Sequence, residues 1–286
     1  MVKIELTQQT CSIVCEPGTC DTFQFMANTL KMKVLHPGGL EVTKLLAKRC
    51  GLSPDMTVLD AGCGSGRSAI FLAKQFGCRI VGVDIEPAPL LKAQAEAMSE
   101  GVSDRVAFRV ADANNLPFQD ETFEGAIFQA ALIFTDKFKA LRMVHQKLRG
   151  DGFLGVVELA WKKTPSERIV QKVRNVLCAA AVNTEIHEDW IRLLSQAGFE
   201  VIHSELLDHE FNFSGIVRNE GFLSSLRIAL KCISDKSVKR KMGQIKSLFK
   251  ETDEYLGYGI YVARKKQVDR SPVEYPNTRA LGDSHN

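Results

Sequence analysis

The stretch Val58–Gly66, VLDAGCGSG, decides the fold. A short apolar segment, Thr57 to Asp60, ends in an acid, and glycine then stands at every second position. Glycine after a strand lets the chain turn tightly and lets a ligand approach the backbone. A helical pattern, SGRSAIFLAKQFG, follows at once and ends at Gly77. The stretch therefore predicts a buried strand, a ligand-binding turn and a helix.

The same alternation continues along the chain from about Thr57 to Leu159. Further strands are expected at RIVGVDIE (79–86), RVAFRVAD (105–112), TFEGAIFQA (122–130) and FLGVVELA (153–160). These are continuous apolar runs, which are typical of a parallel sheet covered by helices on both faces. We therefore expect an α/β fold with a doubly wound sheet.

Composition sets the broad class. The 286 residues are 45% hydrophobic and 25% charged, which is ordinary for a globular protein, and the length suits one large domain or one domain with an insertion. The formal net charge of +3 is too small to indicate a nucleic-acid partner. No apolar run approaches the roughly 20 residues of a membrane span, and MVKIELTQQTC lacks the apolar centre of a signal peptide. We expect a cytoplasmic protein without a membrane span.

The glycine spacing indicates which nucleotide the turn holds. Dinucleotide-binding loops read G-x-G-x-x-G, but Gly62, Gly64 and Gly66 are more closely spaced. Asp60 beside the turn would repel a pyrophosphate, and it suits a cationic or zwitterionic ligand or orients the amides of the loop. A nicotinamide-dependent dehydrogenase is therefore disfavoured.

Two further acids complete the pattern. Asp84 ends the second strand at the usual distance, about 20 residues, of the acid that accepts hydrogen bonds from ribose hydroxyls. Asp112, in ADANNLPF after the third strand, is placed to accept from an adenine amine. Three acids around one pocket favour an adenosine ligand without phosphates.

These residues resemble the class I S-adenosylmethionine-dependent methyltransferases. VLDAGCGSG is similar to their first motif and IVGVDIE to their second strand. ADANNLPFQDETFEGAIF resembles a run typical of the small-molecule branch related to ubiquinone and menaquinone C-methyltransferases. LRGDGFLGVVE matches the turn into their fifth strand, with Gly150 and Asp151 departing from the pattern, and EDWIRLLSQAGFEVI matches the helix before their sixth strand. The resemblance implies a Rossmann-like, seven-stranded sheet with an antiparallel last strand, and S-adenosylmethionine as methyl donor.

The resemblance also implies a donor site. Asp60 and the backbone of the glycine loop approach the methionine part, Asp84 binds the ribose, and Ile85 packs on adenine. Asp112 and the amide of Ala113 read the adenine edge, and Gln129 lies near the amino group or the methyl. The full set of implied donor-binding residues is Asp60, Gly62, Cys63, Gly64, Gly66, Asp84, Ile85, Asp112, Ala113 and Gln129. Cys63 is interpreted as a small side chain, not as a nucleophile, because nothing near it suggests an electropositive setting.

The segments outside this core are expected to build the acceptor site. Residues 1–39 are interpreted as an N-terminal cap and 40–265 as the methyltransferase domain. Helical insertions at about 161–185 and 211–254 are expected to form a substrate lid that excludes water. The segment 266–286 is rich in turn formers, and we expect it to be a mobile tail.

No catalytic group for the acceptor is evident, because in-line methyl transfer depends mainly on alignment. The candidates are His36, in the turn HPGG, and Glu158 and Trp161, which follow the fifth strand at the edge where ligands bind. The default interpretation of His36 is a turn histidine that caps a helix, and contact with the substrate or with the methionine carboxylate is the functional alternative. The apolar run FQAALIF replaces the N/D-P-P-Y/F motif of enzymes that methylate amino groups of bases or glutamine, and suits an apolar or flat small-molecule acceptor. No metal site is predicted.

Alternatives stay open at this point. Among the 8 cysteines, Cys11, Cys15 and Cys20 cluster and raise the possibility of a soft acceptor, a thiol or arsenite. A non-catalytic protein that binds S-adenosylmethionine for regulation is a second alternative. The basic run SDKSVKRKMGQIKSLFK reads as a solvated helix face, or as a site for an acidic substrate or an anionic surface. The oligomeric state is not indicated.

Overall fold

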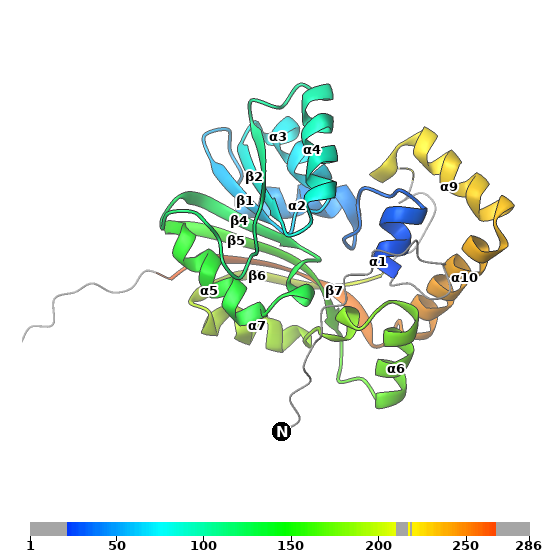
Figure 1. Cartoon of the computed structure of the whole chain (residues 1–286). Helices are drawn as coiled ribbons and strands as arrows, with labels where there is room; N and C mark the ends of the chain where they lie inside the picture. Colours follow the sequence, from blue (N-terminus) through cyan, green and yellow to red (C-terminus); the bar gives the residue numbers. More distant parts are fainter. Residues whose placement is uncertain (1–21, 210–216, 218, 267–286) are drawn as a thin grey trace, which may run out of the picture.

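A seven-stranded sheet forms the centre of the molecule (Figure 1). The computed structural model describes residues 22–209, 217 and 219–266. The strand order across the sheet is β3-β2-β1-β4-β5-β7-β6. The strands are β1 (Thr57–Ala61), β2 (Arg79–Asp84), β3 (Val106–Val110), β4 (Phe123–Gln129), β5 (Leu148–Trp161), β6 (Phe199–Asp208) and β7 (Leu256–Lys265).

The strand directions confirm the expected Rossmann-like architecture. The first five strands pair in parallel. β7 lies between β5 and β6 and runs antiparallel to both. The last strand of the described chain is therefore the antiparallel one.

Helices cover both faces of the sheet, as the continuous apolar strands require. One face carries α2 (Gly39–Cys50), α3 (Arg67–Phe76) and α4 (Pro87–Ser99), and the other carries α5 (Lys137–Lys147) and α7 (His187–Gln196) (Figure 1). On the first face Leu46 and Ile70 pack against Val58. On the second, the fully buried Trp190 packs in the cluster that contains Phe128.

Further helices gather beyond the ends of β4 and β5, on the right of Figure 1. Two of these elements belong to the cap: α1 (Thr22–Gln24) and the π-helical turn η1 (Phe25–Thr29). The others, which we call the lid, are α6 (Glu167–Val176), α9 (Phe222–Ser234) and α10 (Lys236–Glu251). Phe25 and Leu30 pack with Ile228 of α9 and Ile245 of α10. Short 3-10 turns, η2 (Leu132–Phe134) and η3 (Ala180–Val182), connect the lid to the sheet.

One expectation about these outer segments needs adjustment. Trp161 still belongs to β5, so the first helical insertion begins at Glu167, later than the expected 161. Within the described residues, no helix is both long and apolar enough to cross a bilayer.

Candidate active site

The predicted donor-binding residues lie side by side at one edge of the sheet. Strand register pairs Asp60 of β1 with Gly82 of β2 and with Ile127 of β4. Asp84 is the last residue of β2 and Gln129 the last of β4. This is the carboxyl edge of the parallel strands, next to the point where the strand order reverses, and ligands of doubly wound folds bind there.

The glycine loop is held tightly against neighbouring segments. The amides of Gly62 and Cys63 both donate to the carbonyl of Val83, at 2.8 and 2.9 Å. Gly62 has φ +78°, and a Cβ there would collide with the side chain of Ala131. Only glycine meets both demands, because other residues rarely adopt this backbone conformation. The loop therefore has its shape before any ligand arrives.

Asp84 links the loop to the second strand. Its Oδ2 accepts a hydrogen bond from the amide of Gly64 at 2.8 Å, and its Oδ1 accepts one from the amide of Glu86 at 3.0 Å. The role of orienting a loop amide, which the sequence had suggested for Asp60, is thus taken by Asp84. Each carboxylate oxygen keeps further acceptor capacity for a ligand hydroxyl.

Asp60 has a buried carboxylate oxygen that lacks a hydrogen-bond donor among the described residues. Its side chain is only 2% exposed, and its Oδ2 has no hydrogen-bond partner among the described residues. Burial, and secondarily the charge of Asp84, raise the pKa of Asp60 to about 7. A buried unpaired carboxylate is costly, and a nearby cation removes that cost. Oε1 of Gln129 is likewise buried without a partner in the described chain. The two oxygens suit a ligand that carries an ammonium group.

The adenine end of the predicted site is open to solvent. Ile85 is 60% exposed, which leaves its side chain available as a platform. Asp112 stabilises its own turn by accepting from the backbone and side-chain nitrogens of Asn114, at 2.8 and 3.0 Å. Ala113 is buried beneath this turn.

Cys63 sits in this loop without reactive character. Burial, and then the charges of Asp60 and Asp84, raise the pKa of its thiol well above the ordinary value. The thiolate is the reactive form of cysteine. The observed setting therefore matches the interpretation of Cys63 as a small side chain.

His36 lies in a polar cluster that joins the cap to the sheet. Its Nε2 lies 3.3 Å from Nε2 of Gln129 and 3.2 Å from the hydroxyl oxygens of Thr43 and Ser68. An amide nitrogen only donates, so Nε2 of His36 accepts, and Nδ1 then donates to the carbonyl of Pro37 at 3.1 Å. Burial lowers the pKa of His36 to about 4, which keeps the ring neutral. Both ring nitrogens are thus engaged within the protein.

A chamber of about 480 Å³ opens between this cluster and the lid. Its wall includes His36 and Ala130 on the sheet side, and residues of the cap, β6, β7 and α10 on the other. The apolar and aromatic part of the wall comprises Phe23, Met26, Met32, Val34, Leu35, Leu159, Leu177, Leu207, Phe249 and Tyr258. The polar part of the wall includes Thr22, His36, Asp208, His209 and Asn219. A mainly apolar lining with several polar groups is typical of sites for small organic molecules.

His209 stands in this wall as its least engaged polar group. The imidazole stacks on Phe249 with ring centroids 4.4 Å apart and meets Tyr258 edge-on at 5.6 Å. Its Nε2 is buried and has no hydrogen-bond partner among the described residues. Burial, and then Lys162, lower the pKa of His209 to about 4. The imidazole is therefore neutral, it belongs to the chamber wall, and its Nε2 makes no hydrogen bond within the described residues.

Comparison with known proteins identifies the family. A family model described as a methyltransferase domain matches residues 58–152. The chain is 30% identical over 225 residues to an uncharacterized protein of Haemophilus influenzae, covering 76% of this chain and 88% of that protein. It is 26% identical over 243 residues to the O-methyltransferase cnsE of Penicillium expansum, covering 82% and 81% of the two chains. A solved S-adenosylmethionine-dependent methyltransferase from Geobacter sulfurreducens, in complex with S-adenosyl-L-homocysteine, aligns with a TM-score of 0.64 at 21% identity, covering 85% of this chain and 97% of that one.

The chain belongs to the class I S-adenosylmethionine-dependent methyltransferases. S-Adenosylmethionine is its methyl donor. The orphaned acceptors Asp60 and Gln129 and the carboxylate of Asp84 fit that donor, which carries an ammonium group and ribose hydroxyls. The finer resemblance to the quinone C-methyltransferases stays a prediction.

Two of the three catalytic candidates of this methyltransferase are engaged elsewhere. Glu158 is fully buried, and its Oε1 accepts from the amides of Ala131 and Leu132, both at 2.6 Å. Trp161 packs with Leu177 in the apolar cluster between the sheet and the lid. Within the described residues, neither side chain lines the chamber. The sequence had placed both residues after the fifth strand, where contact with the acceptor was expected. In the structure β5 extends to Trp161, so both residues lie within the buried strand.

Replacing Glu158 by glutamine is expected to stabilise the methyltransferase increasingly as the pH rises. Burial raises the pKa of Glu158 to about 8, so the folded state binds a proton that the unfolded state releases above its ordinary pKa near 4.5. Stability from this group is complete below about pH 4.5 and is lost as the pH rises toward 8. Glutamine keeps an acceptor for Ala131 and Leu132 and has no charge to desolvate.

Urea unfolding of the two proteins across this pH window measures the effect. The difference in unfolding free energy should grow by up to about 1.4 kcal/mol per pH unit. A constant difference from pH 5 to pH 8, whatever its size, would contradict the assignment.

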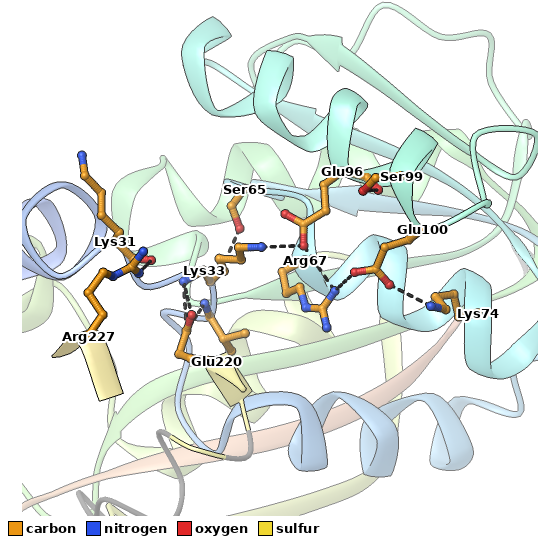
Figure 2. A network of polar contacts seen from close by, with 11 residues as sticks. Lys31, Lys33, Ser65, Arg67, Lys74, Glu96, Ser99, Glu100, Glu220 and Arg227 are labelled. Atoms are coloured by element: carbon orange, nitrogen blue, oxygen red, sulfur yellow. Dashed lines mark hydrogen bonds and ion pairs between the residues drawn. The ribbon is translucent and has the colours of Figure 1, made fainter. Parts of the chain in front are cut away.

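The cap also contacts the glycine loop directly (Figure 2). The hydroxyl of Ser65 donates to the carbonyl of Lys33 at 2.7 Å, and Nζ of Lys33 pairs with Glu96 of α4 at 2.8 Å. The carboxylate of Glu220 accepts from the amides of Lys33 and Val34 at 2.9 to 3.0 Å. The segment around Lys33 is thus fixed between the donor loop and the lid.

The sequence did not indicate several residues of the chamber wall, and some candidate residues lie outside the described part of the chain. The wall residues Met26, Phe249 and Tyr258 belong to no motif, and no feature of the sequence distinguishes His209 from the other histidines. Cys11, Cys15 and Cys20, and the tail from residue 267, lie outside the described residues. Within the described part of the chain, no group of three or more metal-binding side chains is placed to hold a metal ion.

Proposed function

We propose that this methyltransferase transfers the methyl group of S-adenosylmethionine to a hydroxyl oxygen of a small, largely apolar molecule. The observation that carries the proposal is the chamber, whose apolar wall contains one neutral imidazole with an unoccupied nitrogen. An apolar acceptor fits the wall, and a single hydroxyl fits the nitrogen. The relative from Penicillium expansum, named as an O-methyltransferase, supports the same atom class.

The geometry of the carboxyl edge supports the proposed donor-binding roles. The bound donor supplies an electrophilic methyl group on a sulfonium. Asp84 accepts from the ribose hydroxyls while it holds Gly64, and Asp60 accepts from the ammonium. Ile85, with Asp112 and Ala113, forms the adenine pocket. Gln129 stands at the boundary between donor and chamber, because its amide reaches the His36 cluster.

His209 is proposed as the proton acceptor. In-line displacement by a hydroxyl forms the oxygen–carbon bond as the carbon–sulfur bond breaks, and the oxygen's proton becomes strongly acidic. Nε2 of His209 takes that proton, and the low pKa of the ring is sufficient because a protonated ether is a far stronger acid than imidazolium. His36 is assigned to positioning, since both of its nitrogens are already engaged.

Methylation of a matched acceptor panel tests the proposed function. We expect release of S-adenosylhomocysteine with aromatic or aliphatic alcohols of apolar character, and none with their methyl ethers. Mass spectrometry should place the new methyl group on oxygen. Methylation restricted to carbon, amines or thiols in the same panel would contradict the proposal.

The panel also separates the soft-acceptor alternative. Thiol acceptors and arsenite are included, and the triple variant Cys11→Ser, Cys15→Ser, Cys20→Ser is the control. Full activity of this variant on alcohols argues against a role for these cysteines. Activity on arsenite that the variant loses would support the alternative.

A further inference from the structure

Helix α9 of the lid exposes a continuous apolar stripe. The stripe comprises Phe222, Leu223, Leu226, Leu230 and Ile233, with exposed fractions from 46% to 80%. At 3.6 residues per turn these five positions fall within an arc of about 100°. The buried side of the helix is a different one, where Ser225 and Ile228 face the N-terminal cap.

The stripe differs from ordinary surface exposure. Single exposed apolar residues are common on soluble proteins, whereas contiguous exposed patches mark binding surfaces. Other exposed apolar side chains in the described chain, such as Leu91 and Met98 of α4, are one or two per element. The lid helix alone gathers five on one face.

Next to the stripe, the lid carries an uncompensated positive charge. The exposed basic residues of α10 are Lys236, Lys239, Arg240, Lys246 and Lys250, and none of them forms an ion pair within the described residues. On α9, Arg227 and Lys231 reach the backbone carbonyls of Lys31 and Thr29 and no acid (Figure 2 for Arg227). The exposed apolar stripe of α9 and the exposed basic residues of α10 therefore lie on consecutive helices of the lid.

We propose that α9 and α10 form a docking surface for an anionic lipid bilayer. An amphipathic helix with apolar residues on one side and basic residues beside them lies in the headgroup region of such a bilayer. Juxtaposed lysines and arginines add attraction to anionic lipids. α9 has 13 residues, fewer than the roughly 20 of a spanning helix, so it lies on the membrane and does not cross it.

Charge favours a bilayer over a second copy of this chain. Two copies that met through the stripe would bring the basic residues of both α10 helices together, and like charges across an interface oppose association. A bilayer with anionic headgroups offers opposite charge together with an apolar interior. The surface formed by α9 and α10 therefore fits an anionic bilayer better than the same surface of a second copy of this chain.

The docking surface and the chamber belong to the same lid. Phe249 of α10 lines the chamber, while Ile245 of the same helix packs against the inner side of α9. A docked enzyme therefore holds its apolar chamber close to a bilayer, from which an apolar acceptor is expected to come. Docking itself requires neither donor nor acceptor, so its test stands apart from that of the proposed function.

Vesicle co-sedimentation of the full chain tests the proposal. We expect binding to phosphatidylcholine vesicles that contain about 30 mol% phosphatidylglycerol, weaker binding to pure phosphatidylcholine, and a loss of binding as salt is raised. The double variant Leu223→Ser, Leu230→Ser should partition about tenfold more weakly or worse, because it removes two side chains from the buried stripe. The variant Lys239→Glu, Lys246→Glu should lose the preference for the anionic vesicles.

The matched control removes two equally exposed apolar residues from another helix. Leu91→Ser, Met98→Ser on α4 should bind like the unmodified protein, and thermal unfolding should show all variants folded. Absence of vesicle binding by the unmodified protein, or an equal loss in the control, would overturn the proposal. Light scattering that shows a dimer, dissociated by Leu223→Ser, Leu230→Ser, would overturn it in favour of a second copy.

Discussion

Replacing Asp84 by asparagine is expected to weaken the binding of S-adenosylhomocysteine by about 100- to 1000-fold. The carboxylate holds the amides of Gly64 and Glu86 and is proposed to accept from two ribose hydroxyls as well. Hydrogen bonds to a charged group contribute about 1.5–3 kcal/mol each, and two weakened bonds account for this range. Asparagine keeps one acceptor for the loop, so the fold should survive.

Isothermal titration calorimetry measures this effect directly. Asp104→Asn, at an exposed turn of the same half of the sheet, is the control and should leave the affinity unchanged. A retained affinity in Asp84→Asn would mean that the ribose is held elsewhere. Thermal unfolding without ligand separates loss of the site from loss of the fold.

Replacing His209 by glutamine should reduce kcat by about 100- to 10,000-fold, the usual contribution of a positioned base. Glutamine keeps polarity and approximate size, so KM for the acceptor should change little. Because burial holds the pKa of His209 near 4, the unmodified enzyme should show no titration of this residue from about pH 6 to pH 8. Its activity should fall only as the pH approaches 4, where the ring gains its proton.

The pH profile distinguishes a base from a structural residue. Without His209 the acceptor's proton must go to solvent base, so the activity of His209→Gln should rise with pH across the range in which the unmodified enzyme is flat. His203→Gln, on β6 just before His209 but outside the chamber wall, should behave like the unmodified enzyme. A variant with lower activity but the same flat profile would indicate that His209 only shapes the chamber.

The parallel half of the sheet was predictable because its signals are local. The run from Val58 to Gly66 specifies strand, turn and helix within one short segment, and Gly77 ends the helix where the sequence indicates. Asp60, Asp84 and Gln129 come together because parallel strands end at the same edge. The nearness of these three residues, on which the proposed donor site rests, therefore follows from the order of the strands.

The acceptor chamber was not predictable in the same way. Its wall joins Met26 in the cap with Phe249 on α10 and Tyr258 on β7, and only the packing of the lid decides which side chains face inward. Glu158 shows the converse. An acid in the apolar run VVELA suggested a catalytic role. In the structure its carboxylate accepts hydrogen bonds from the backbone just after β4, and these bonds join positions that lie 26 and 27 residues apart in the sequence.

The place of β7 in the sheet has a consequence for how the chain is made. β7 is the last described strand in sequence, yet it lies between β5 and β6. During synthesis the parallel strands emerge first, and β5 keeps an unpaired edge until Leu256–Lys265 has left the ribosome. An open strand edge invites pairing with other chains. The nascent protein is therefore most exposed to aggregation before Leu256–Lys265 emerges, and truncation before residue 256 should leave the parallel strands assembled but with an unprotected edge.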